Sequence, residues 1–172
     1  FLGNTDPKKN TKGTLKAFSD FSKTHSEFKL VMLDYDLAEL KKILNEIGNP
    51  ALIHSIVLTG YVKNTDLPAI YSQSKVFLYP SLRESFGIPM LEAMACGVPV
   101  ITSNTSSMPE VAGNAACFVD PLNVDEIAQA MQTIATRSDL REELIKNGRL
   151  QRQKYSWNNS AKLLWGSIEK CL

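Results

Sequence analysis

Two glutamates, Glu84 and Glu92, stand where their carboxylates could act on a ligand. Glu84 lies in the polar loop before a predicted helix, where free N–H groups and the positive end of the helix dipole favour anions. Glu92 lies about one turn into that helix, and no Lys or Arg stands three or four residues to either side of it. A carboxylate without a local cation can accept hydrogen bonds from the vicinal hydroxyls of a ribose. The alternatives are a Glu84 that caps the helix or pairs with Arg83, and a Glu92 satisfied by backbone or by a distant Lys.

The loop that runs from the first glutamate into the helix, Glu84-Ser85-Phe86-Gly87-Ile88, is suited to binding an anion. Gly87 lets the backbone approach a ligand closely, and a helix N-terminus offers unpaired N–H groups to a phosphate. An anion bound there gains about 0.3–1 kcal/mol, and up to about 2 kcal/mol when partly buried. Alternatively, Gly87 serves only the close packing of the helix on the sheet.

A further candidate for phosphate binding lies in the turn-rich basic loop 4–12, which follows a predicted strand at residues 1–3. The loop contains Lys8, Lys9 and Lys12. A lysine at the end of a strand can reach a phosphate as a point charge. Alternatively, the three lysines only form a solvated loop.

The segment that positions the two glutamates, Val76–Thr102, predicts a complete strand–helix–strand unit. A short apolar strand occupies 76–79, and a helix opens at Phe86-Gly87. Gly97 stands just past the helical run, where a left-handed cap is expected to end the helix. A second buried strand follows at 98–101.

The rest of the chain alternates in the same way between short apolar runs and helical patterns. Further strands are predicted at 1–3, 28–33, 53–58 and 115–119, and helices ending near 23 and at 36–47, 66–71, 106–112, 123–136, 138–155 and 156–168. Apolar strands that are each followed by a helix predict a doubly wound, Rossmann-like α/β fold with a parallel sheet covered on both faces. Such sheets bind ligands at the carboxyl ends of their strands, where Lys9, Gly60-Tyr61 and Glu84 all fall.

Composition excludes several classes of function. A net charge of +1 argues against a nucleic-acid or membrane-surface role based on bulk charge, and no apolar run is long enough for a transmembrane helix. Three widely spaced cysteines favour free thiols in a reducing compartment. His25 and His54 lack metal-type spacing, and P-loop, dinucleotide and nucleophile-elbow motifs are missing. Because the chain starts with Phe1 inside an apolar run, we expect a fragment of a longer protein.

Taken together, the motifs resemble those of retaining glycosyltransferases with two Rossmann-like domains, the GT-B type, and most closely their family 4, the glycosyl transferases group 1. The spacing of Glu84 and Glu92 around F-G-I-P is similar to the E-x7-E signature of that family. The other matching segments are Asp6–Asn10, Leu58–Val62, Leu67–Tyr71, Pro80-Ser81, Leu91–Ile101, Met108–Val111 and Tyr155–Trp157. The resemblance therefore covers nearly the whole chain.

The resemblance implies that residues 1–172 are a single domain, the C-terminal half of such an enzyme. Its last helices, about 138–172, would pack on the outside or reach toward an N-terminal domain. The implied activity is transfer of a hexose from a nucleotide-diphosphate sugar, of UDP or GDP type, with the anomeric configuration retained and without a cofactor or metal. The acceptor, a sugar or a lipid-linked glycan, would bind the N-terminal domain, so this chain alone is expected to be inactive.

The resemblance also implies roles for individual residues. Glu84 would be catalytic, beside the donor sugar; Lys9 would neutralise the diphosphate, and Glu92 would hold the ribose. Backbone around Tyr61 would edge the base. The loop residues that would meet the phosphate and sugar are Ser85, Phe86, Gly87 and Ile88. Polysaccharide or glycoconjugate synthesis in the cytoplasm would follow, with no nucleic-acid partner, and the full-length protein could associate peripherally with the inner face of the plasma membrane.

Two departures from the family pattern bear on donor affinity. Asn4 replaces an arginine that the family usually has, which removes a cation, and Leu33–Asp36 replaces a Gly-rich turn, which adds the carboxylate of Asp34. Lys8 or Arg83 would have to compensate. The alternatives to a transferase are therefore a non-catalytic module that binds nucleotide sugars and another GT-B enzyme, such as a phosphorylase or an epimerase.

Overall fold

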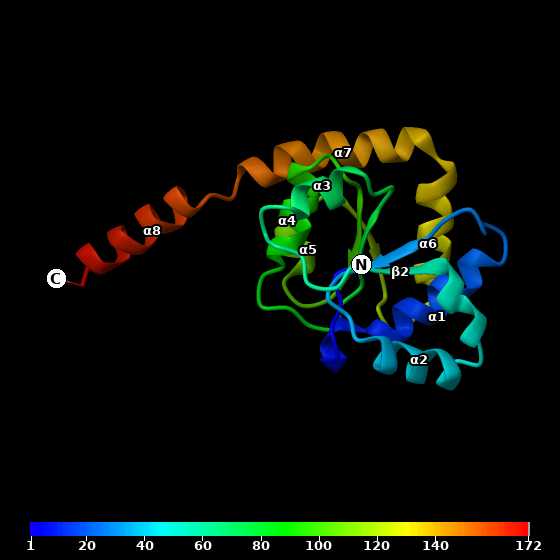
Figure 1. The fold of residues 1–172 in the computed structure, drawn as a ribbon. Helices are drawn as coiled ribbons and strands as arrows, with labels where there is room; N and C mark the ends of the chain where they lie inside the picture. The colour runs from blue at the N-terminus through cyan, green and yellow to red at the C-terminus, as the bar shows by residue number, and fades with distance from the viewer. Residues whose placement is uncertain (172) are drawn as a thin grey trace.

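Parallel strands form the centre of the molecule, which is described by a computed structural model covering residues 1–171 (Figure 1). The strands in these residues are β1 (Leu30–Met32), β2 (Ile56–Leu58), β3 (Phe77–Tyr79), β4 (Val100–Ser103) and β5 (Ala116–Val119). β1 pairs with β2, and β3, β4 and β5 pair in that order, all in parallel. The predicted α/β class with parallel sheets is confirmed.

Helices connect the strands and cover them. They are the 3-10 segments η1 (Pro7–Lys9) and η2 (Pro50–Ser55) and the α-helices α1 (Thr11–Ser22), α2 (Leu37–Glu46), α3 (Leu67–Ser72), α4 (Ile88–Ala95), α5 (Met108–Ala112), α6 (Val124–Thr136), α7 (Ser138–Gln153) and α8 (Trp157–Glu169). Asp36, Asn123 and Ser156 each accept a hydrogen bond from the N–H three residues on, which fixes the starts of α2, α6 and α8.

Each face of the strands has its own core. Leu78 of β3 and Ile101 of β4 pack with the apolar side chains of α1, α2 and α6. Their neighbours Phe77, Tyr79 and Val100 point to the other face and pack with α4 and α5. Because side chains alternate along a strand, β3 and β4 can be covered on both sides by helices, as Figure 1 shows.

The central unit β3–α4–β4 is confirmed, with shifted ends. Gly87 and Gly97 both have positive φ, at 98° and 72°, and mark the two ends of α4. The second strand begins at Val100 because the N–H of Val98 still donates to the carbonyl of Ala93, 3.0 Å away, and so belongs to the end of the helix.

Two other strand predictions were wrong in part. Residues 1–3 run beside β1 with the Phe1 amine donating to Val31 O and Leu33 N–H donating to Phe1 O, but two hydrogen bonds do not make a ladder there. In 53–58, the 3-10 turn that starts at Pro50 continues to Ser55 and leaves only Ile56–Leu58 as strand. Short apolar runs do not reveal how many of their residues will pair.

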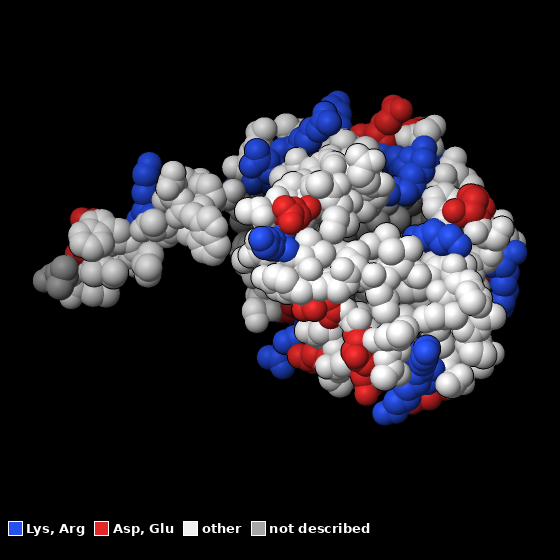
Figure 2. All heavy atoms as spheres, viewed as in Figure 1, with Lys and Arg blue, Asp and Glu red and all other residues white. Residues whose placement is uncertain are grey.

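The last two helices differ in their relation to the body. α7 packs against α4, whereas α8 buries none of its residues and extends away from the strands (Figure 1). Residue 172, the end of the predicted 138–172 segment, lies outside the described residues. Basic and acidic side chains are interspersed over the face seen in Figure 2. In residues 1–171, no helix combines the length and apolar character needed to cross a bilayer.

Candidate functional site

An ion pair between Lys9 and Glu84 joins the end of η1 to the loop after β3. Lys9 Nζ donates to Glu84 Oε1 at 2.7 Å, and the two side chains are only 13% and 11% exposed. The same ammonium lies 3.3 Å from the hydroxyl of Tyr79 and 5.1 Å from the centre of its ring. Glu84 therefore pairs with a residue 75 positions away. The side chain of Glu84 therefore pairs with Lys9, and it neither pairs with Arg83 nor caps α4, the two alternatives considered for it.

The other two lysines of the loop are also paired, but at the surface. Lys8 Nζ lies 3.1 Å from Asp6, and Lys12 Nζ lies 2.7 Å from Glu46. Exposed pairs of this kind contribute little to stability. The loop is thus electrically balanced, and Lys9 differs from its neighbours by its burial.

Two serines before α5 hold the loop that contains Glu84. Ser106 Oγ donates to Glu84 O at 2.7 Å, and Ser107 Oγ lies 3.1 Å from both Glu84 O and Phe86 O. Sequence reasoning missed both residues. The only signal was their place directly after β4, beside the strand that leads to Glu84.

Gly87 is required by its backbone and by its surroundings. Its φ of 98° disfavours any side chain, and an added Cβ would lie 2.6 Å from the terminal methyl of Met90 and 3.9 Å from the Tyr79 ring. Gly87 therefore does allow α4 to pack closely on the sheet, as one of the two interpretations of this residue predicted. The backbone of Phe86 and Gly87 leads into the first turn of α4, next to the Lys9–Glu84 pair, so an anion could meet both there.

Glu92 lies in α4, one turn after its first residue, Ile88. Its Oε2 accepts a hydrogen bond from Tyr71 at 3.3 Å. Together with Phe86 and Ile88 it lines a cavity of about 550 Å³, which Arg152 and Trp157 also line. The structure thus brings these three predicted residues to one opening, while Ser85 is exposed in the loop beside them.

Tyr61 lies apart from this group. Its side chain is 78% exposed on the loop after β2. That loop meets the loop after β1, since Asp34 N–H donates to Gly60 O at 3.0 Å. Asn4 turns back on its own loop and accepts from Asp6 N–H through Oδ1. Of the two departures from the family pattern, Asp34 thus joins the loops after β1 and β2, and Asn4 shapes its own loop before η1.

Asn10 ties three of these loops together. Its side-chain amide donates to Pro80 O at 3.0 Å and to Pro121 O at 2.7 Å, in the loops after β3 and β5. It has a positive φ of 54°, a conformation that asparagine tolerates better than most residues. Sequence reasoning did not single it out.

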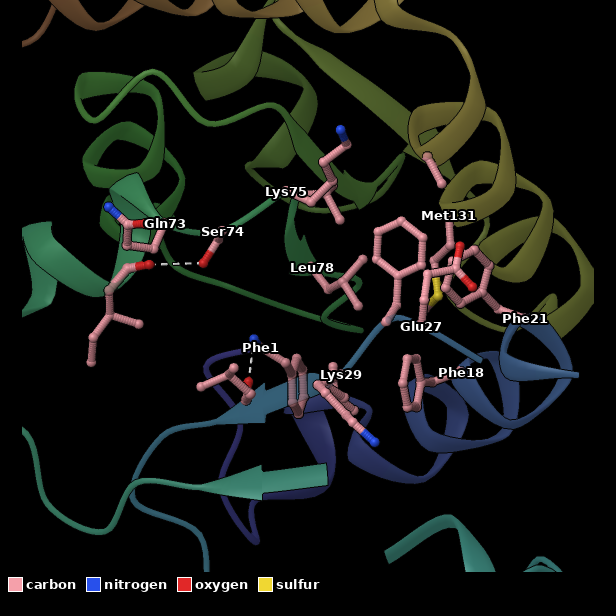
Figure 3. Close-up of a pocket in the computed structure, with 16 residues that line it drawn as sticks. Phe1, Phe18, Phe21, Glu27, Lys29, Gln73, Ser74, Lys75, Leu78 and Met131 are labelled. Atoms are coloured by element: carbon pink, nitrogen blue, oxygen red, sulfur yellow. Dashed lines mark hydrogen bonds between the residues drawn. The ribbon is translucent and has the colours of Figure 1, made fainter. Parts of the chain in front are cut away.

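A second cavity, of about 310 Å³, lies at the other edge of the strands (Figure 3). Phe1, Phe18, Phe21 and Leu78 line it, near the amino ends of β1 and β3. None of the predicted site residues borders it. The larger of the two cavities, of about 550 Å³, is the one that Phe86, Ile88 and Glu92 line, so cavity size and the predicted residues point to the same part of the molecule.

Tyr71 and Tyr79 give the site a measurable response to alkaline pH. Burial, followed by the nearby carboxylates of Glu92 and Glu84, raises the pKa of each phenol above its usual range. In the unfolded chain both ionise near pH 10. Their stabilising effect is thus complete below about pH 10 and is lost as the pH rises further, by about 1.4 kcal/mol per pH unit for each tyrosine.

We expect the free energy of unfolding, measured by urea titration between about pH 10 and pH 11.5, to fall less steeply in Tyr79→Phe than in the unchanged chain. The slope should flatten by about 1.4 kcal/mol per pH unit. Tyr61→Phe, which removes an exposed phenol, should leave the slope unchanged. An unchanged slope in Tyr79→Phe would mean that the phenol ionises freely in the folded protein.

Comparison with known proteins shows the family to which the chain belongs. The sequence pattern of the family described as "Glycosyl transferases group 1" matches residues 1–151. The chain belongs to this family. Among similar proteins of Escherichia coli, O-antigen chain mannosyltransferase B is 35% identical over 92% of this chain, and a serotype-specific mannosyltransferase is 33% identical over 94% of it.

Solved structures agree on the fold of this group 1 chain. The C-terminal domain of a glycosyl transferase group 1 family protein from Francisella tularensis matches 90% of the chain and 82% of its own, with a TM-score of 0.77 and 23% identity. Sucrose-phosphate synthase from Thermosynechococcus elongatus matches 99% of this chain and 45% of its own, with a TM-score of 0.82 and 24% identity. The fold is that of the C-terminal domain of GT-B glycosyltransferases.

The relatives are longer than this chain. The matched region spans 42% of O-antigen chain mannosyltransferase B and 20% of the serotype-specific mannosyltransferase. The chain thus corresponds to a part of these longer mannosyltransferases.

Proposed function

We propose that the chain is the donor-binding domain of a retaining glycosyltransferase that uses a nucleotide-diphosphate sugar of UDP or GDP type. The observation that supports this most is the buried Lys9–Glu84 pair beside the first turn of α4. A cation and helix N–H groups at one point suit a diphosphate. The carboxylate next to that cation suits the sugar that the diphosphate leaves.

In this proposal the diphosphate takes over the hydrogen bond that Lys9 now gives to Glu84. Charge grows on the diphosphate as its bond to the anomeric carbon breaks, and preorganised donors that meet such charge lower the barrier. Lys9 and the backbone of Phe86, Gly87 and Ile88 are those donors. Glu84 then lies beside the sugar, and Glu92 accepts hydrogen bonds from the ribose hydroxyls. The backbone near Tyr61 contacts the edge of the base.

The exposed apolar side chains of α8 fit the same proposal. Trp157, Leu164 and Trp165 are each at least 60% exposed. We propose that this helix packs on a domain that binds the acceptor, a sugar or lipid-linked glycan, in a protein of the relatives' length. Polysaccharide synthesis, a cytoplasmic location and peripheral association with the inner membrane face stay predictions from the sequence.

A calorimetric panel tests the donor class. UDP, GDP and ADP, with their hexose conjugates, are titrated into the 172-residue chain, and we expect saturable binding of a UDP or GDP ligand. Binding followed by no transfer in any longer form of the protein would favour the non-catalytic module. Absence of binding for every nucleotide would contradict the proposal.

Glu92→Ala tests the ribose contact. We expect the chosen nucleotide to bind about 1.5–3 kcal/mol more weakly, the range for a lost hydrogen bond to a charged group, with the fold unchanged by circular dichroism. The matched control is Glu142→Ala, an exposed carboxylate on α7. Equal affinity for Glu92→Ala and the unchanged chain would remove Glu92 from the ribose role.

A further inference from the structure

Three aromatic side chains form a row under the site. The ring of Phe77 lies between those of Tyr71 and Tyr79, with centroids 5.2 Å and 5.6 Å apart. Phe77 and Tyr79 come from β3, and Tyr71 comes from α3. All three belong to the core under α4 and are at most 3% exposed, so their positions are set by packing.

The two hydroxyls at the ends of the row meet the two charged parts of the site. Tyr79 OH lies 3.3 Å from the ammonium of Lys9, which pairs with Glu84. Tyr71 OH donates to Glu92 Oε2 at 3.3 Å. The ordinary pKa of a tyrosine is about 10, so both phenols are protonated at neutral pH and act as neutral hydrogen-bonding groups. Burial raises the pKa of each phenol further.

We propose that Tyr71 and Tyr79 are positioning residues, and that the row fixes the Lys9–Glu84 pair and Glu92 relative to each other. The roles of those charged groups rest on the proposed function. Within that function, the row sets the separation between the cation for the diphosphate and the carboxylate for the ribose.

Packing alone does not explain the two hydroxyls. Phenylalanine would fill the same volume, and a buried hydroxyl is costly unless it is hydrogen-bonded. In residues 1–171, the side-chain hydrogen bonds of these two tyrosines run to the charged groups of the site. The hydrogen bonds to Lys9 and Glu92 therefore explain why both ends of the row are tyrosine and not phenylalanine.

Lysine labelling tests the Tyr79 contact without any nucleotide. Under limiting acetic anhydride, followed by peptide mass spectrometry, Lys9 should react several-fold more slowly than Lys8 and Lys12, whose side chains are 49% and 51% exposed. Tyr79→Phe should speed the labelling of Lys9 and leave the other two unchanged. Unchanged protection of Lys9 would overturn the proposal even if no donor has been found.

A second variant covers the case in which Tyr79→Phe unfolds. In Glu84→Gln, Tyr79 remains as a partner of Lys9, so Lys9 should still label more slowly than Lys8. Equal labelling of the two lysines in the folded Glu84→Gln variant would show that the phenol of Tyr79 does not fix Lys9.

Binding measurements test the positioning role itself. For whichever of UDP and GDP binds, Tyr79→Phe should weaken the diphosphate about three- to tenfold, the value of one hydrogen bond, and leave the nucleoside unaffected. Tyr71→Phe should weaken both, because it acts through Glu92. Phe18→Leu, a buried aromatic residue of the other core, is the control. Equal losses of nucleoside and diphosphate in Tyr79→Phe, or the same loss in Phe18→Leu, would show a merely structural effect.

Discussion

Lys9→Met is expected to weaken the binding of the nucleoside diphosphate about ten- to a hundredfold while leaving the bare nucleoside unaffected. Methionine keeps much of the length of the side chain and removes its charge, and a hydrogen bond to a charged group contributes about 1.5–3 kcal/mol. Only the phosphates feel that charge. Calorimetric titration of both ligands into the 172-residue chain measures the difference.

Lys8→Met is the matched control for Lys9→Met, since its ammonium belongs to the same loop but pairs at the surface with Asp6. It should change neither affinity. Because Lys9→Met leaves the carboxylate of Glu84 without its partner, the thermal transition of each variant is recorded as well. A loss of the same size for nucleoside and diphosphate would mean that Lys9 acts through the fold.

The 172-residue chain is expected to bind its donor but to transfer the sugar to an acceptor at least about five orders of magnitude more slowly than a complete enzyme of the family. Every charged group of the candidate site serves the donor in our proposal. Holding the acceptor hydroxyl at the anomeric carbon can provide about 7–11 kcal/mol of the barrier reduction, and losing most of that produces a rate loss of this size. Slow hydrolysis of the donor is the only turnover that we expect.

Release of the nucleotide in the presence of free and lipid-linked acceptors measures this second prediction. The unchanged chain without acceptor gives the background of hydrolysis, and Glu84→Gln gives the background without the proposed catalytic carboxylate. Acceptor-dependent release well above both would place an acceptor site within these residues.

The strand–helix–strand unit around Glu84 could be predicted because its ends are marked locally. Gly87 and Gly97 have the left-handed conformations that glycine permits, and they lie where the sequence required the helix to begin and end. The apolar strands between such marks left few arrangements other than a parallel sheet. Residues 1–3 were wrongly predicted as a strand, because whether a short apolar run pairs depends on which segments lie beside it in the fold.

The contacts of the site could not be predicted in the same way. Lys9 and Glu84 were each identified, but their direct pairing spans 75 residues and depends on how two loops fold over Tyr79. Ser106, Ser107 and Asn10 act through backbone carbonyls of other loops. Hydroxyl and amide side chains are common in loops, so their types and spacing gave no signal.

The pairing of all three lysines in the first loop has a consequence for how a donor arrives. Each ammonium is balanced by a carboxylate, and the chain as a whole has a net charge of +1. Balanced pairs produce little field beyond the Debye length, about 8 Å at physiological ionic strength. Electrostatic steering of an anionic ligand is therefore weak, and the association rate depends little on salt. Attraction acts only after the phosphates have reached Lys9 and begun to displace Glu84.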